Sequence, residues 1–272
     1  MSKTDLMQFA SSTYSQRGQD GILSKLFDLL DIERGYCVEF GAWDGVKFSN
    51  TRALTESGWG GVLIETHAAR FKELEALYQD RSDVITLNRA IDIGKNSLDS
   101  ILSECNAPID LDFVSIDIDG DDYHVWNSIQ KFKPKVVLIE SNPYFPPFIE
   151  FVQSYNSKHL PMGASALSTF LLGEKKGYRA VAYIGQDWLF VRDDLLPDLA
   201  FPSYFEMTIK GGVIRGGNKI SIGDRKELES GVAGTGFVDL ETELNALRHF
   251  FTPDEDSHFY IRSSRDELEE LT

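Results

Sequence analysis

Residues 36–45 read YCVEFGAWDG, a short apolar run followed by a turn that contains two glycines. The run of β-branched and aromatic residues predicts a buried strand. Glycines directly after a strand let backbone N–H groups approach a ligand without a side chain in between. The pattern Glu39-x-Gly41-x-x-x-Gly45 lacks the GxGxxG spacing that fits a dinucleotide pyrophosphate, which argues against a nicotinamide enzyme.

Around this segment, short apolar runs alternate with segments of helical spacing. Further strands are expected at 60–66, 83–91, 111–119, 135–141, 179–185 and 187–192, and helices at 22–30, 50–56, 68–80, 96–105, 123–132 and 165–176. Ser15 is the expected N-cap of the first helix, and Ser49 or Asn50 that of the second. Strands that are apolar on both faces and alternate with helices indicate a parallel sheet covered on both sides. We therefore expect an α/β, doubly wound, Rossmann-like sheet of seven strands, mostly parallel, with a terminal antiparallel hairpin.

The composition narrows the classes of partner. The formal net charge of −16 repels phosphate backbones, so no nucleic-acid partner is expected, although solubility alone explains an acidic surface. No apolar run reaches about 20 residues, and the start of the sequence lacks the zones of a signal peptide, so we expect no membrane partner. Cys37 and Cys105 form no metal-type cluster, and Cys37 is expected to be a buried free thiol. These features together predict a cytoplasmic protein.

The length of 272 residues suits one large α/β domain with an appendage. We assign residues 1–195 to a ligand-binding domain and 196–272 to a C-terminal extension that binds substrate or supports oligomerisation. The glycine-rich run KGGVIRGGNKISIGD in this extension resembles no further βα unit.

Glu65 ends the second predicted strand, 20 residues after Gly45. A carboxylate at this place can accept hydrogen bonds from both hydroxyls of an adenosine ribose. The alternative is a solvated acid at the end of a strand.

Several segments carry a family resemblance: YCVEFGAWDG and GGVLIET look like class I S-adenosylmethionine-dependent methyltransferases. More narrowly, SQRGQDGIL, FVSIDIDGDDY, VVLIESNP and GYRAVAYIGQDWLFVR resemble the FkbM-like methyltransferases, a group that commonly methylates hydroxyls of sugars and natural products. The resemblance covers residues from about 14 to 192. It implies a class I methyltransferase sheet, S-adenosylmethionine as the cofactor, and a small, carbohydrate-like acceptor.

The resemblance also implies a set of cofactor residues: Glu39, Gly41, Asp44, Gly45, Asn50, Glu65, Ala90, Ile91 and Asp117. In this set Glu39, Gly41 and Gly45 would line the methionine portion, and Glu65 would hold the ribose. Ala90 and Ile91 would flank the adenine, and Asp117 would lie beneath the sulfonium. Ser15, Gln16 and Gln19 would approach the methionine end.

Four acids, Asp117, Asp119, Asp121 and Asp122, lie within six residues at the end of the fourth predicted strand. Together with Glu140 and Asn142 after the fifth strand, Asp119 resembles a set of oxygen ligands for Mg²⁺ or another divalent cation. The paired acids that the family carries after the fifth strand are replaced here by ESN. The alternative is that the acids cap the next helix or hold the cofactor.

His124 and Asp119 are the expected catalytic residues. The acceptor oxygen would attack the sulfonium methyl group in line, and His124 or a cation bound by Asp119 would remove the proton. A structural role for His124 is the alternative, and His159 and Tyr144 are lesser candidates. The aromatic and proline-rich segment 142–165 is expected to cover the acceptor pocket or to pack as an ordinary loop, and Trp43 to form a pocket wall or fill the core.

The sequence therefore predicts an S-adenosylmethionine-dependent O-methyltransferase that acts on a small acceptor and can form a homo-oligomer. Two alternatives remain open, a nucleotide-dependent oxidoreductase and a non-catalytic nucleotide-binding or scaffold protein on the same fold.

Overall fold

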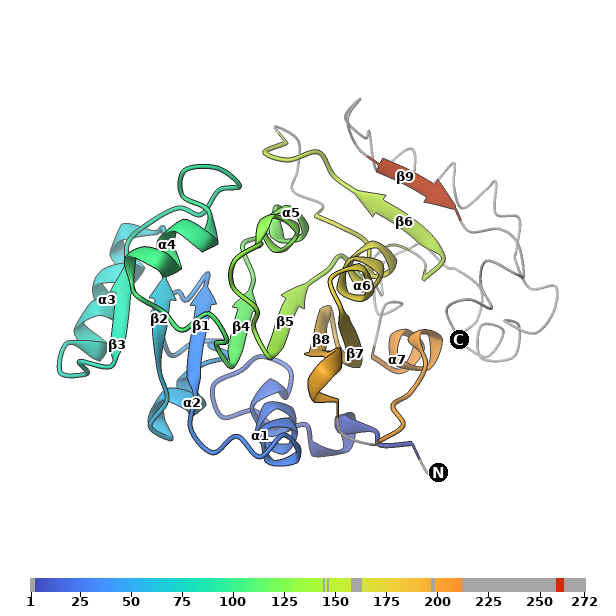
Figure 1. The fold of residues 1–272 in the computed structure, drawn as a ribbon, viewed down its shortest axis with the longest axis horizontal. Coiled ribbons are helices and arrows are strands. Elements are labelled where there is room, and N and C mark those ends of the chain that lie inside the picture. The colour runs from blue at the N-terminus through green and yellow to red at the C-terminus, as the bar shows by residue number, and fades with distance from the viewer. Residues whose placement is uncertain are drawn as a thin grey trace.

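The computed structural model of the chain describes residues 3–143, 145, 147–157, 163–196, 199–211 and 258–261. Its main sheet has seven strands in the order β3-β2-β1-β4-β5-β8-β7 (Figure 1). Their bounds are β1 Tyr36–Phe40, β2 Gly60–Ile64, β3 Val84–Leu87, β4 Phe113–Ile116, β5 Val136–Glu140, β7 Tyr178–Ile184 and β8 Asp187–Arg192. The first five strands pair in parallel, and β8 runs antiparallel to both β5 and β7. The predicted fold class is confirmed.

Helices cover both faces of the sheet. They are α1 Gln19–Leu29, α2 Arg52–Glu56, α3 Ala68–Tyr78, α4 Leu98–Glu104, α5 Asp122–Ser128, α6 Ala166–Lys175 and α7 Tyr204–Gly211, with 3-10 turns η1 Leu6–Phe9 and η2 Asp193–Leu195. Apolar side chains of α4, α5, α6 and α7 share one core cluster, and those of η1, α1 and α2 share another. In Figure 1, α1 lies on one side of the strands and α5 and α6 on the other.

Neighbouring residues of a strand enter different core clusters. Val38 and Phe40 of β1 pack in the cluster of α4 to α6, whereas Cys37 packs in the cluster of α1. Because side chains alternate across a strand, β1 has to be apolar on both faces, as the sequence predicts. Cys37 is fully buried, as expected, and its burial raises the pKa of the thiol.

The ends of several elements differ from the predicted ones. The N-cap of α1 is Gly18 with φ of 96° instead of Ser15, and that of α2 is Thr51. Strand β3 ends at Leu87, so the predicted strand residues 88–91 lie beyond the sheet. Ser97 and Ser165 cap α4 and α6, each by accepting a hydrogen bond from the backbone N–H three residues on.

A second, two-stranded antiparallel sheet joins β6 (Ile149–Val152) and β9 (His258–Ile261), and it lies beyond α6 from the main sheet (Figure 1). The expectation that aromatic rings of 142–165 cover an acceptor pocket is wrong for Phe145, Phe148 and Phe151, which are buried in the main core. Tyr144 and His159 lie outside the described residues.

The described part of the predicted extension packs on the sheet domain. Tyr204 of α7 stacks on Trp188 of β8 at 5.7 Å between ring centroids and donates a hydrogen bond to the carbonyl oxygen of Pro147 at 2.7 Å. The division at residue 195 stays a prediction. None of the helices in the described ranges combines the length and hydropathy that a membrane span needs.

Candidate functional site

A cavity of about 940 Å³ opens at the carboxyl ends of the parallel strands. This is where an open α/β sheet binds its ligand. Seven of the nine predicted cofactor residues line it: Glu39, Gly41, Asn50, Glu65, Ala90, Ile91 and Asp117. Glu39 and Glu65, which end neighbouring strands, therefore lie on one shared cavity.

The carboxylate of Glu39 is bound by the segment that begins α2. Its Oε1 accepts the N–H of Asn50 at 2.7 Å, and its Oε2 accepts the hydroxyls of Ser49 at 2.8 Å and Thr51 at 2.6 Å. Burial raises the pKa of Glu39, and these three hydrogen bonds oppose that rise. Glu39 therefore fixes the turn that carries Asn50, and it also lines the cavity.

Asn50 offers an unused acceptor at this cavity. Its amide nitrogen donates to Ser115 Oγ at 3.1 Å, whereas its buried Oδ1 has no hydrogen-bond partner among the described residues. A buried polar atom without a partner costs free energy unless a ligand or water satisfies it. Oδ1 of Asn50 can therefore accept a hydrogen bond from a ligand or a water in the cavity.

The two glycines of the first turn have different tasks. A Cβ on Gly41, which has φ of 79°, would lie 2.0 Å from the carbonyl oxygen of Asp117, so only glycine lets the ends of β1 and β4 approach so closely. Gly45 faces Leu74 of α3, and Asp44 accepts the N–H groups of Val46 and Lys47 within its own turn. Gly45 and Asp44 shape the turn and do not line the cavity.

Glu65 is also engaged by backbone. Its Oε2 accepts the N–H of Trp43 at 2.8 Å and its Oε1 the N–H of His67 at 2.5 Å, which ties the turns after β1 and β2 together. Oε1 also accepts the hydroxyl of Thr66 at 3.4 Å, so Oε2 is the oxygen that keeps a second lone pair for a ligand hydroxyl. Trp43 is the exposed tryptophan of this rim, and Arg70 lies 5.0 Å above its ring.

The segment before α1 brings Gln16 and Arg17 to the cavity wall. Ser15 and Gln19 instead bond within the fold, to the N–H of Asp20 and to Asp187. The sequence analysis places Gln16 near the methionine end of the cofactor and does not include Arg17. The SQRGQD run alone does not reveal which of its side chains are used by the fold.

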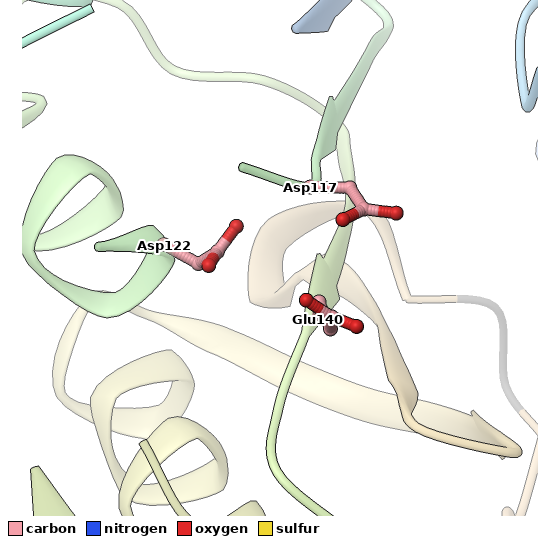
Figure 2. A group of neighbouring side chains, drawn as sticks. All are labelled: Asp117, Asp122 and Glu140. Atoms are coloured by element: carbon pink, nitrogen blue, oxygen red, sulfur yellow. The ribbon is translucent and has the colours of Figure 1, made fainter. Parts of the chain in front are cut away.

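Three acids meet at the end of β4 and β5. Asp117, Asp122 and Glu140 each place a carboxylate oxygen within 4.8 Å of the others. Figure 2 shows the carboxyl group of Asp122, at the start of α5, directed toward the other two. Burial raises the pKa of Asp117 to about 6 and that of Asp122 to about 7. Burial raises the pKa of Glu140 further, and the charge of Asp117 is the second cause of that rise.

The predicted cation ligands do not come together as a set. Asp119, with φ of 57°, lines the cavity but is outside the group of three, and Asn142 bridges to Ser165 away from the cavity lining. Both oxygens of Asp122 accept backbone N–H groups, and Gln186 donates to Glu140. These bonds occupy carboxylate lone pairs that a hard cation would otherwise use. We therefore propose no metal-dependent step.

His124 lies outside the large cavity. Its Nε2 is 2.6 Å from the carbonyl oxygen of Gln153, so this nitrogen carries the proton and donates. The ring faces a separate cavity of about 350 Å³ between α5, α6 and β6. Asp119 is the predicted catalytic residue that the structure places on the large cavity.

Solved structures of other proteins are similar to this chain at low sequence identity. The N-terminal domain of EvdMO1, in the presence of SAH and D-fucose, is 10% identical, with 64% of this chain and 82% of that chain covered and a TM-score of 0.42. The CurJ carbon methyltransferase is 11% identical over 65% of this chain and 55% of that chain, with a TM-score of 0.42. The fibrillarin pre-rRNA processing protein of Methanococcus jannaschii is 13% identical over 59% and 67%, with a TM-score of 0.40. No family model matches the chain, and no curated protein matches it.

Proposed function

We propose that this chain is an S-adenosylmethionine-dependent methyltransferase that methylates a hydroxyl oxygen of a small acceptor. The observation that carries the proposal is the shared cavity onto which Glu39, Glu65 and Asp117 open from three neighbouring strands. The sulfonium of the cofactor is a cation, so carboxylates around it stabilise its binding. The finer assignment to the FkbM-like group rests on the sequence resemblance.

The rest of the cavity suits a hydroxyl-rich acceptor. Its wall beyond Asp117 carries amide, hydroxyl and acidic side chains, namely Gln16, Asp119, Asp121, Gln153, Asn156, Ser157 and Gln186. Such groups hydrogen bond to sugar hydroxyls in either direction. A volume of about 940 Å³ is at the upper end for single-ligand sites, which favours room for a cofactor and an acceptor together.

In this reading the protein contributes alignment of the acceptor oxygen with the methyl group and exclusion of water. Asp119 is the group that we propose to receive the hydroxyl proton, because it lines the cavity and its side chain is exposed there. His124 is more distant from the cavity than the sequence suggested, and we assign the proton transfer to Asp119 in preference to it.

Calorimetric titration tests the cofactor. The protein should bind S-adenosylmethionine and S-adenosylhomocysteine and should not bind NAD. Saturable binding of NAD in place of the adenosyl ligands would support the oxidoreductase alternative, and binding of neither would contradict the proposal.

Two variants then separate binding from turnover. Glu65→Ala should weaken the affinity for S-adenosylmethionine about tenfold or more, because it removes the ribose acceptor and unties the turns that hold Trp43 and His67. Asp119→Asn should change this affinity less than threefold and should lower the rate of methyl transfer to any accepted hydroxyl. Wild-type affinity in Glu65→Ala would show that the ribose lies elsewhere.

A further inference from the structure

The run SQRGQD (15–20) forms a folded loop that is held by its own side chains. Asp20 Oδ2 accepts the backbone N–H groups of Thr13 at 2.7 Å, Tyr14 at 2.7 Å and Ser15 at 3.0 Å. Ser15 Oγ accepts the N–H of Asp20 at 3.0 Å in return. These reciprocal bonds fix the shape of the loop just before α1.

Gly18 and Gln19 attach this loop to the rest of the fold. Gly18 has φ of 96°, and a Cβ there would lie 2.7 Å from Cβ of Ala10. The buried side chain of Gln19 accepts the N–H of Arg17 at 2.7 Å and donates to Asp187 Oδ2 at 2.7 Å. Four of the six residues are therefore used by the fold, and Gln16 and Arg17 are left on the cavity wall.

The guanidinium of Arg17 lies at the cavity wall, and its charge is not paired by a neighbouring acid in the described residues. Its side chain lies against the β7–β8 turn, where a Cβ on Gly185 would come 2.5 Å from Cδ and 2.9 Å from Nη1. Within the described ranges no hydrogen bond or salt bridge of this guanidinium is found. Its positive charge is near enough to Asp117 and Asp187 to oppose the rise that burial gives to their pKa values.

The other cations of the cavity already have partners. Arg89 Nη1 donates to Glu104 at 2.7 Å, and Nζ of Lys47 lies 5.0 Å from the ring centroid of Phe48. Among the described residues that line the cavity, Arg17 is thus the unpaired arginine or lysine beside the three acids. An anion bound near Asp117 would be repelled by the acids unless a cation such as Arg17 compensated for them.

We infer that Arg17 binds the α-carboxylate of the amino-acid end of S-adenosylmethionine. The inference rests on the proposed function and adds a residue that discriminates among cofactors. The amino-acid end carries an ammonium and a carboxylate side by side, next to the sulfonium. The acids at the end of β4 suit the two cationic groups, whereas the carboxylate needs the planar guanidinium, which can donate two parallel hydrogen bonds.

The test compares S-adenosylmethionine with its decarboxylated analogue by calorimetry, in wild type, Arg17→Gln, Arg17→Lys and the exposed control Arg179→Gln. The readout is the ratio of the two dissociation constants. From wild type to Arg17→Gln, the preference for the carboxylated ligand should fall about tenfold, the usual value of a charged hydrogen bond. Arg17→Lys should retain part of the preference, and Arg179→Gln all of it. A structural role alone would weaken both ligands equally.

The outcomes separate the inference from the function on which it rests. A change in the ratio of threefold or more supports the role of Arg17. A smaller change, with both ligands still bound, overturns that role and leaves the methyltransferase assignment standing. Wild-type protein that binds neither ligand overturns both. If Arg17→Gln does not fold, as judged by its thermal unfolding midpoint, the ratio in Arg17→Met decides by the same threefold limit, because methionine keeps much of the length of the side chain and removes the charge.

Discussion

The carboxylates on the two sides of the cavity have different surroundings. After β1 and β2, Glu39 and Glu65 are surrounded by donors of the protein itself, backbone N–H groups and hydroxyls. After β4 and β5, the acids Asp117, Asp122 and Glu140 face one another. On the first side each carboxylate accepts several donors, whereas the second side groups three acids within 4.8 Å of one another, although Asp122 and Glu140 also accept hydrogen bonds.

This contrast suggests a division of labour. Carboxylates that accept several N–H bonds act as fixed anchors, and they hold the turns of the cavity in place before a ligand binds. Carboxylates that repel one another become more favourable when a cation arrives, because the cation restores their charged forms. We expect the second side to respond to ligands and the first to determine the stability of the fold.

The largest expected effect comes from removing an anchor. Glu39→Ala leaves the N–H of Asn50 and the hydroxyls of Ser49 and Thr51 without their buried acceptor. We expect the free energy of unfolding, measured with denaturant, to fall by about 4 kcal/mol. Glu39→Gln is the matched control and should lose about half as much, since its amide keeps one acceptor oxygen. Equal, small losses in both variants would mean that the turn stands without Glu39.

On the side of the three acids, removing a carboxylate should raise the free energy of unfolding instead of lowering it. Asp187, which pairs with Glu140 across β5 and β8, is the residue to change. Burial raises the pKa of Asp187 to about 7, from 3.8, with the charge of Asp117 as the second cause. Between pH 4 and 7 the unfolded chain has lost this proton while the folded protein keeps it, so the free energy of unfolding falls as the pH rises through this window. Asp187→Asn, which retains an acceptor for Gln19, should remove about 2 kcal/mol of that fall and be more stable than wild type at pH 8.

Denaturant titrations at pH 5 and pH 8 measure this difference. The variant and wild type should differ less at pH 5 than at pH 8. A variant that is less stable than wild type at pH 8 would show that Asp187 is an anchor like Glu39, and the contrast between the two sides would no longer hold.

The smallest effect is expected at His124. Its Nε2 donates to Gln153, and its ring faces the small cavity, so it cannot contact a ligand in the large one. His124→Gln should change the rate of methyl transfer less than threefold, with a loss of stability of about 1 kcal/mol from the hydrogen bond. A loss of rate of a hundredfold, with unchanged cofactor affinity, would return the catalytic role to His124.

The sequence predicted the main sheet because most of its strands are buried on both faces and bounded by turns or helices, whereas the edge strand β3 is only partly buried. The pair β6–β9 was missed because the partner of Ile149–Val152 is more than 100 residues away, and pairing over such a distance leaves no periodic signal. The end of β3 was placed too late, since the polar and apolar residues of 88–91 continue the strand pattern without the backbone pairing.

Within the site, strand-end position pointed to Glu39 and Glu65 and the family resemblance added Asp117, and all three line the cavity because the sheet order brings these strand ends together. It could not separate residues that face a ligand from residues that shape a turn, which is why Asp44 and Gly45 were included. The proximity of His124 to the acids in sequence was misleading, because α5 turns its side chain toward Gln153. The group of three acids contains Asp122 in place of Asp119, since the backbone reverses at Asp119 and Gly120.

The tryptophans provide a built-in optical reporter of the cavity. Trp59, Trp126 and Trp188 are fully buried, whereas Trp43 is 38% exposed at the cavity rim. The emission of the three buried indoles is a constant, blue-shifted background, and the emission of Trp43 depends on what occupies the cavity. Intrinsic fluorescence of the unlabelled chain can therefore follow ligand binding at this rim, with Trp43→Phe as the variant that removes the signal.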